Sequence, residues 1–218
     1  MCFSAIASFS AGTVLTTAGI ITTQKVQSKS QLAFAAIPLL FGIQQLGEGF
    51  VWLSLTHQQY AHWQQAGTHA FLFFAHALWP VWVPFAALLF ETKQPQKTIL
   101  FVFFILGLLL SLCEIYCLSA YHVESRIYGK HIEYLITYPS PFVAVSEIVY
   151  GIVTLVPCFI SSFKNIRWFA IVLATSLVLT GIFYQAWLIS VWCFFAALLS
   201  VIIYRILALQ NKISLPTA

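Results

Sequence analysis

The fold is decided by residues 98–119, TILFVFFILGLLLSLCEIYCLS, in which Glu114 is the single charged residue. A transmembrane helix needs about 20 mostly apolar residues, because each residue advances it by about 1.5 Å through a hydrocarbon layer of about 30 Å. This stretch is long enough to span a membrane. We therefore predict that it crosses a bilayer and that Glu114 lies inside the membrane.

Six further stretches approach the same standard, and the connections leave no room for a second domain. The seven predicted spans are residues 4–23, 32–55, 69–91, 98–119, 142–162, 167–185 and 187–208. The composition agrees, since 61% of the residues are hydrophobic and 7% are charged, against about 25% charged in soluble domains. The sequence predicts an all-α integral membrane bundle of seven transmembrane helices, forming a single domain over residues 1–218.

The lysines and arginines predict how the bundle is oriented. Cytoplasmic connections of membrane proteins carry an excess of these residues. The first, third and fifth connections and the C-terminal tail are basic, whereas the second and sixth contain neither residue. The fourth and longest connection has Arg126 and Lys130 beside Glu124 and Glu133, and we expect it to fold back over the bundle as a cap. This pattern predicts an N-terminus outside and a C-terminus in the cytoplasm. No signal peptide is recognised, so the first span is expected to remain in the membrane.

Four ionisable residues lie within the second to fifth predicted spans: Glu48, His76, Glu114 and Glu147. Counting residues from the predicted helix ends places each of them roughly 8–11 Å inside the outer boundary. A charge in hydrocarbon costs several kcal/mol, so intramembrane ionisable residues usually mark functional sites. Their similar depth predicts a common pocket to which each of these spans contributes one side chain.

The chemistry of the predicted pocket is open between three interpretations. Carboxylate oxygens and imidazole nitrogen are ligands for zinc, iron or manganese, and helical bundles build metal sites from inward-facing Glu and His. If the protein is an enzyme, the metal would activate water against a lipid-like substrate, with one Glu as general base. Neither an ExxH nor an HExxH motif is present, however. The alternatives are a proton-coupled transporter or small-ligand sensor, and a structural or partner-binding protein in which the polar groups hold helices together.

Several neighbours of the four residues are expected to line the pocket. They lie near the outer side, or on the faces of the ionisable residues: Cys2, Gln44, Gln45, Trp52, Trp79, Cys117 and Tyr150. Pro80 predicts a kink just after His76. A stripe of small residues, Ser8, Gly12 and Thr16, predicts close helix packing of the first span. The net charge of +4 comes from scattered pairs at the expected membrane ends, so the lipid bilayer is the expected partner and nucleic acid is not.

Three motifs carry a resemblance to a known family. They are MCFSAIASF at residues 1–9, PLLFGIQQLGEGFVW at residues 38–52 and HALWPVWVP at residues 76–84. The sequence resembles an uncharacterised family of bacterial multi-pass membrane proteins whose chains open with an MCFSA-x-ASF motif. The resemblance implies a bacterial cytoplasmic membrane, and it implies that Cys2, Gln44, Gln45, Glu48 and Trp52 belong to the family pattern. It brings no established activity.

Overall fold

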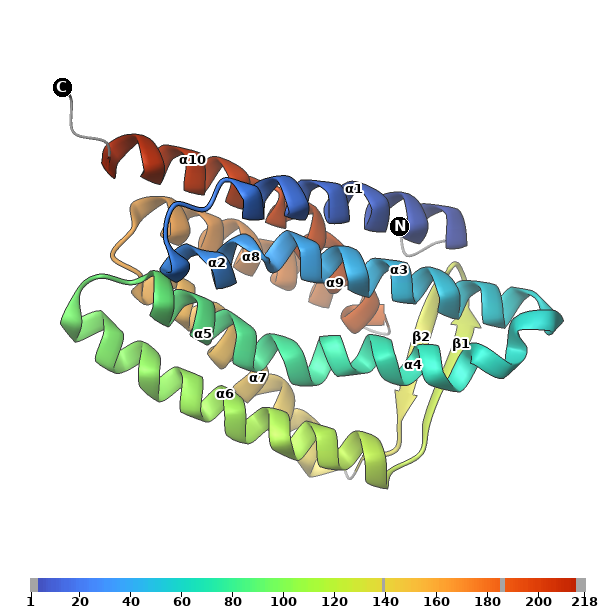
Figure 1. Cartoon of the computed structure of the whole chain (residues 1–218). Helices are drawn as coiled ribbons and strands as arrows, with labels where there is room; N and C mark the ends of the chain where they lie inside the picture. The colour runs from blue at the N-terminus through green and yellow to red at the C-terminus, as the bar shows by residue number, and fades with distance from the viewer. Residues whose placement is uncertain (1–3, 139, 185–186, 215–218) are drawn as a thin grey trace.

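The computed structural model describes residues 4–138, 140–184 and 187–214, so the predicted pocket residue Cys2 lies outside the described residues. Within these ranges, seven helical stretches run alternately in opposite directions and form one bundle (Figure 1). In chain order the stretches are α1 (Ala5–Gln24); α2 (Lys29–Ala35) with α3 (Ile37–Thr56); η1 (Gln58–Trp63), α4 (Gln64–Leu72), η2 (Phe73–Leu78) and α5 (Trp79–Phe90); α6 (Gln94–Ala120); α7 (Ser140–Ile160); α8 (Lys164–Phe183); and α9 (Leu188–Ser200) with α10 (Ile202–Ser214).

Most of these stretches have the length and composition of transmembrane helices. In the described part of the chain, six are long and apolar enough to cross a membrane: Ala5–Gln24, Lys29–Thr56, Gln58–Phe90, Gln94–Ala120, Lys164–Phe183 and Leu188–Leu209. The α7 stretch contributes a shorter apolar helix, Val145–Ile160. Of the seven predicted spans, the structure therefore confirms a mostly helical bundle with six to seven helices long and apolar enough to span a membrane.

The longest connection forms a β-hairpin, which corrects the all-α prediction. Strands β1 (Val123–Tyr128) and β2 (His131–Ile136) pair in antiparallel register from Val123 opposite Ile136 to Tyr128 opposite His131. The turn between them uses Gly129 at φ 65°, a conformation that glycine adopts without steric cost. We call the end of the bundle that carries these strands the hairpin end.

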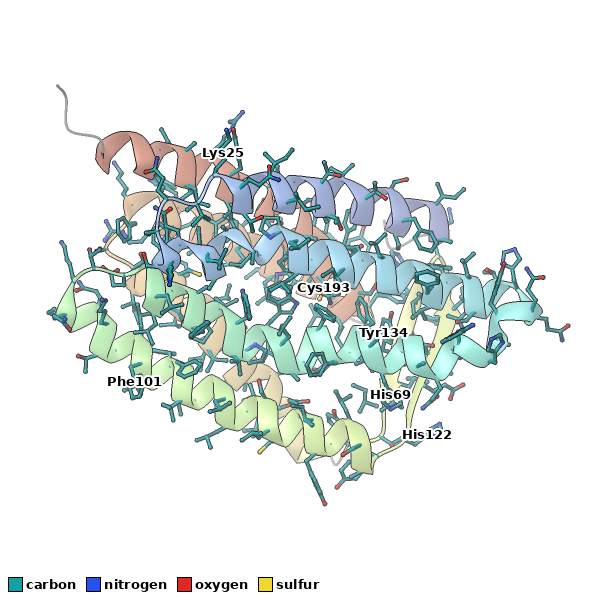
Figure 2. The ribbon with its side chains drawn as sticks, in the orientation of Figure 1. Lys25, His69, Phe101, His122, Tyr134 and Cys193 are labelled. Atoms are coloured by element: carbon teal, nitrogen blue, oxygen red, sulfur yellow. The ribbon has the colours of Figure 1, made fainter. Side chains whose placement is uncertain are left out.

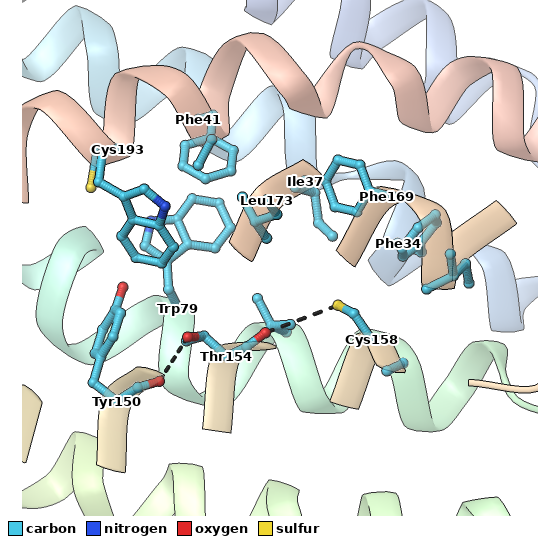
Figure 3. A pocket seen from close by; sticks show the side chains of 15 residues that line it. Phe34, Ile37, Phe41, Trp79, Tyr150, Thr154, Cys158, Phe169, Leu173 and Cys193 are labelled. Carbon is cyan, nitrogen blue, oxygen red and sulfur yellow. Dashed lines mark hydrogen bonds between the residues drawn. The ribbon is translucent and has the colours of Figure 1, made fainter. Parts of the chain in front are cut away.

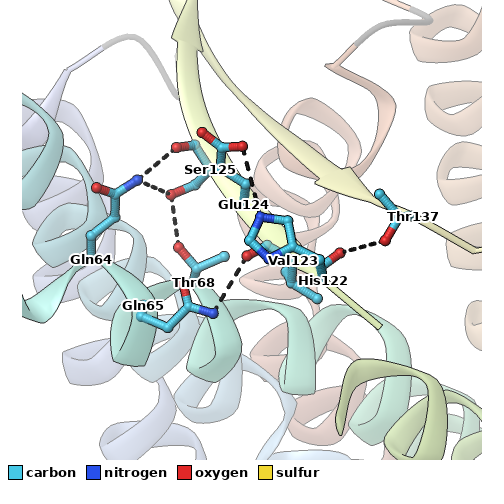
Figure 4. A network of polar contacts seen from close by, with 8 residues as sticks. All are labelled: Gln64, Gln65, Thr68, His122, Val123, Glu124, Ser125 and Thr137. Atoms are coloured by element: carbon cyan, nitrogen blue, oxygen red, sulfur yellow. Dashed lines mark hydrogen bonds and ion pairs between the residues drawn. The ribbon is translucent and has the colours of Figure 1, made fainter. Parts of the chain in front are cut away.

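Polar contacts fasten the hairpin to the start of α4 (Figure 4). The side-chain amide of Gln64 donates to the carbonyl of Ser125 at 2.8 Å, and the buried hydroxyls of Thr68 and Ser125 lie 2.7 Å apart. On the other strand, the ring of Tyr134 stacks on Phe71 with 4.6 Å between centroids. The hairpin is thus docked on the bundle by hydrogen bonds and by aromatic packing.

The opposite end of the bundle is basic. It carries the turns between α1 and α2, between α5 and α6, and between α7 and α8, with Lys25, Lys29, Lys93 and Lys164 at or beside them. Figure 2 shows Lys25 at this end and His122 at the hairpin end. We call it the basic end.

Helices α1 and α3 pack closely through small residues, as the sequence predicted. Ser8, Gly12 and Gly19 of α1 are buried. A Cβ added at Gly12 would lie 2.9 Å from the backbone nitrogen of Leu46, and one added at Gly42 would lie 2.6 Å from that of Thr16. The two backbones can approach this closely because glycine has no side chain.

The expected kink after His76 takes the form of a π-helical segment. Residues Phe73–Leu78 form η2, a π-helix, and Pro80 follows at the first turn of α5. Proline lacks an N–H, so a helix loses a backbone hydrogen bond where proline occurs. Close to Pro80, the buried hydroxyl of Ser111 in α6 donates a hydrogen bond to the Ala77 carbonyl. At Gly107, a Cβ would overlap the Pro80 carbonyl, so α6 must carry glycine there.

At the basic end, Glu91 connects two turns. Its side chain is buried and accepts hydrogen bonds from the backbone N–H groups of Thr92 and Lys93 at 2.8 and 3.0 Å. It also accepts from the N–H and hydroxyl of Ser162 at 2.7 and 2.6 Å. This carboxylate therefore joins the α5–α6 turn to the α7–α8 turn.

Candidate functional site

His76 and Glu114 meet in the interior of the bundle. Nδ1 of His76 lies 3.3 Å from Oε2 of Glu114, and their side chains are 18% and 2% exposed. The hydroxyl of Tyr138, which precedes α7, donates to the same carboxylate oxygen at 3.2 Å. Burial raises the pKa of Tyr138 and the Glu114 carboxylate raises it further, so the phenol stays protonated and acts as a donor.

Local structure explains why these side chains meet. His76 belongs to the π-helical segment η2, whose wider turns often occur at functional sites. Glu114 lies one turn after Ser111 on the buried face of α6, and Ser111 contacts the carbonyl of Ala77 beside His76. Two adjacent contacts thus hold α6 against the irregular segment.

A cavity of about 80 Å³ adjoins the pair. Its lining includes His76, Glu114, Glu147, Tyr150 and Trp192. Nε2 of His76 and Nε1 of Trp192 are buried and have no hydrogen-bond partner among the described residues. Because a buried polar atom without a partner costs free energy, both atoms are available to a bound molecule.

Glu48 belongs to a different polar group. It is fully buried, and it accepts hydrogen bonds from Ser8 of α1 at 3.4 Å and from Ser190 of α9 at 2.6 Å. One turn earlier on α3, Gln44 accepts from the indole of Trp79 at 2.9 Å and donates to Cys193 of α9 at 3.4 Å. Cys193 also lines the cavity beside His76, so the two polar groups meet at α9.

Glu147 is exposed rather than buried. It lines the 80 Å³ cavity beside His76 and also a larger cavity of about 450 Å³ under the hairpin. The larger cavity is bounded by Ile132 and Tyr134 of the hairpin and by Ser190 of α9. Glu147 therefore lies where the two cavities adjoin.

The remaining predicted pocket residues have different surroundings. Tyr150 lines the cavity, and Trp79 stacks on Phe41 with 3.9 Å between ring centroids. Trp52 packs under the hairpin against Ile132, and Cys117 is buried in α6. Gln45 is fully buried, and its amide has no hydrogen-bond partner in the part of the chain that the structure describes.

The four predicted metal ligands are not assembled into one set. In the described ranges, no group of three or more His, Cys, Asp or Glu residues lies where it could hold a metal ion. His76 and Glu114 form a pair, Glu48 lies with serines, and Glu147 is on the cavity wall. The zinc, iron or manganese site gains no support from this geometry and stays a prediction.

Sequence reasoning missed the hydroxyl groups that complete both polar groups. Ser8 was predicted to serve helix packing alone, and none of Tyr138, Ser190 and Ser111 was predicted to contact a buried polar group. The available signal was weak: each is an isolated hydroxyl in or beside a predicted span, and serine and tyrosine are common there. Only the rotation of each helix shows which hydroxyls face a carboxylate.

Comparison with known proteins identifies the family of the chain. A family model described as "Family of unknown function (DUF6629)" matches residues 1–216. No curated protein and no solved structure matches the chain.

Proposed function

Since the chain belongs to this family of unknown function over residues 1–216, we propose a function from the geometry: the protein binds a small ligand within the membrane, at the cavity beside His76 and Glu114. The ligand would carry a hydrogen-bond-donating group. In this proposal the protein is a ligand sensor or receptor, and the site opens toward the hairpin end.

The proposed orientation follows from the charges at the two ends. Lys25, Lys29, Lys93 and Lys164 lie at the basic end, and lysine-rich connections favour the cytoplasmic side. At the hairpin end, Arg126 is paired with Glu133 at 2.6 Å. We propose that the hairpin end faces outward from a bacterial cytoplasmic membrane, so that the ligand enters from outside or from the outer leaflet.

One observation carries the proposal: Nδ1 of His76 has a polar partner, whereas Nε2 has none among the described residues. Nδ1 lies 3.3 Å from the buried Glu114 carboxylate, which favours a proton on Nδ1. Nε2 then keeps its lone pair, and this buried atom of a cavity-lining residue has no partner among the described residues. A neutral imidazole fixed in this tautomer accepts a hydrogen bond from a ligand O–H or N–H.

The cavity is less suited to proton transport across the membrane. The polar side chains His76, Glu114 and Glu147 line it, and Glu147 also lines the cavity under the hairpin. Beyond Tyr150 and Trp192, the next cavity along the bundle is lined almost wholly by apolar side chains. A proton relay needs a continuous series of polar groups, and this lining favours binding over conduction.

The test is nuclear magnetic resonance of protein labelled with ¹⁵N-histidine in detergent micelles, with ethylamine as the probe. His76→Gln assigns the His76 signals by their loss. We expect the His76 ring in the Nδ1–H tautomer, and we expect ethylamine to shift its Nε2 resonance in a saturable way. His122→Gln, which changes an exposed histidine at the hairpin end, should leave that response unchanged. A His76 ring with its proton on Nε2, or one indifferent to ethylamine and to other small amines and alcohols, would refute the proposal.

A further inference from the structure

Three of the cavities lie in a row along the bundle. The 450 Å³ cavity under the hairpin shares Glu147, Leu188 and Ile189 with the cavity beside His76. That cavity in turn shares Tyr150, Trp192 and Cys193 with a third cavity of about 50 Å³, toward the basic end. Shared lining residues mean that these cavities are direct neighbours, separated only by the side chains that they share.

The third cavity is apolar. Figure 3 shows it with Tyr150 and Cys193 at one end and Phe34 and Cys158 at the other. Its other lining includes Phe41, Phe169 and Leu173. The hydroxyl of Thr154 donates to the Tyr150 carbonyl at 2.7 Å, so it is not offered to the cavity. A polar group would be poorly solvated here, whereas a hydrocarbon chain would be well accommodated.

The middle one of the three cavities, beside His76, is lined by acidic side chains. Glu114 and Glu147 line it, and its described lining residues include neither lysine nor arginine. A carboxylate or phosphate would be repelled by two glutamates, whereas an ammonium group would be attracted by them and could donate to Nε2 of His76. The indole N–H of Trp192, which is 8% exposed, is left for a hydroxyl or another acceptor on the same ligand.

We propose that the ligand is a single-chain amphiphile with an amine or amino-alcohol head. The head lies beside His76, Glu114 and Glu147. The alkyl chain enters the apolar cavity past Tyr150 and Trp192, whose rings meet edge-to-face with 6.0 Å between centroids and must separate to admit it. This inference rests on the proposed function and adds the ligand's class. A cavity volume of about 10–15 Å³ accommodates one water molecule. A methylene group is about the size of a water molecule, so the 50 Å³ cavity holds about four methylene groups. Each buried methylene tightens binding by about four-fold.

The experiment compares ethylamine, octylamine, octanol and octanoate as probes, with concentrations corrected for partition into the micelle. Binding is read from the shift of the His76 resonance. We expect octylamine to bind about 250-fold more tightly than ethylamine, from about four buried methylenes. Octanol should bind more weakly than octylamine, and octanoate should bind most weakly of the three.

Two substitutions test the contributions of the ligand's head and of its alkyl chain separately. Ala87→Leu fills part of the apolar cavity and should bring octylamine close to the affinity of ethylamine while leaving ethylamine unchanged. Ala70→Leu, at an exposed position of α4, is the matched control and should change neither. Glu147→Gln should weaken octylamine several-fold and leave octanol unchanged, because it removes charge and not volume.

The outcomes distinguish the two proposals. If ethylamine binds and octylamine binds no more tightly, or if Ala87→Leu has no effect on octylamine, the ligand has no chain in this cavity and the inference fails while the proposed function stands. If octanoate binds as tightly as octylamine, the assignment of an amine head is wrong. If no probe shifts the His76 resonance, both proposals fail together.

Discussion

At the scale of single residues, Glu91 is the carboxylate with the best-defined surroundings. Burial raises the pKa of Glu91, but the hydrogen bonds from the backbone and side chain of Ser162 and from the backbone of Thr92 and Lys93 outweigh burial and lower it below its ordinary value of 4.5. The ionised form is therefore favoured in the folded protein. Because two turns depend on the same carboxylate, its loss should affect the whole basic end.

We expect Glu91 to make stability depend on pH in the acidic range. A group whose pKa is lower in the folded state stabilises the fold above its unfolded pKa, and this contribution is lost as the pH falls through the folded value. The thermal midpoint in detergent should fall as the pH drops below about 4.5. Glu91→Gln should lower stability by about 1–3 kcal/mol at pH 7, because N–H donors lose a charged acceptor. It should also flatten the acidic decline.

The exposed Glu124, whose Oε2 lies 4.0 Å from Nε2 of the exposed His122, is a control. Glu124→Gln should keep the wild-type midpoint at pH 7 and the wild-type acidic decline. A Glu91→Gln protein whose midpoint follows the wild-type curve at every pH would show that the carboxylate does not stabilise the turns.

The candidate site shows how far residues can be predicted from sequence. Counting along helices gave depth, and it selected His76 and Glu114, which lie 3.3 Å apart in the structure. Counting does not show how each helix is rotated about its own axis, and therefore which side chains face one another. In the structure Glu48 accepts hydrogen bonds from Ser8 and Ser190 and does not line the cavity beside His76, and Glu147 is exposed. Rotation depends on how neighbouring helices pack, and that information lies in side chains far apart in the chain.

At the scale of elements, the packing of α1 against α3 can be tested within one helix. Gly42 faces Thr16 of α1, whereas a Cβ added at Gly47 would meet nothing within 4 Å. We expect Gly42→Ala to destabilise the protein by about 1–3 kcal/mol, because the backbones must separate. Gly47→Ala should be neutral or stabilise the helix by up to about 1 kcal/mol. Thermal unfolding midpoints in detergent measure both, and equal midpoints for the two variants would contradict the close approach.

The hairpin and the π-helix were the elements that sequence reasoning did not predict. Residues 123–136 carry β-branched and aromatic residues on both sides of Gly129, which is a strand-turn-strand signal. In a chain dominated by apolar helices it was interpreted as a capping loop, and its position as a cap was correct. The π-helix has no sequence signal beyond Pro80, because proline predicts a kink and not its form.

At the scale of the whole molecule, the arrangement of the helices followed closely from hydropathy. Seven predicted spans correspond to seven helical stretches, and basic residues gather at one end of the bundle. Spans are easy to predict because every backbone polar group in hydrocarbon must be satisfied within its own helix. The contacts between spans follow no such local rule, which is why the cavities could not be predicted.

The proposed orientation makes a prediction about accessibility in intact bacterial cells. Lys130→Cys in the hairpin turn and Lys93→Cys at the basic end are both exposed positions. They are compared in a chain whose Cys2 and Cys113 are replaced by serine. A membrane-impermeant maleimide should label Lys130→Cys in intact cells and Lys93→Cys only after lysis. The reverse pattern would place the hairpin in the cytoplasm.

The π-helical segment has a consequence for changes in chain length. A π turn holds one residue more than an α turn, so deleting one residue from Phe73–Leu78 would let an ordinary α-helix form. Because the wider turn absorbs the extra residue, helices α4 and α5 would keep nearly the same relative rotation, and Thr68 would still face Ser125 of the hairpin. The deletion would instead change the positions of the side chains within the segment itself, so the added residue serves to present His76 to Glu114.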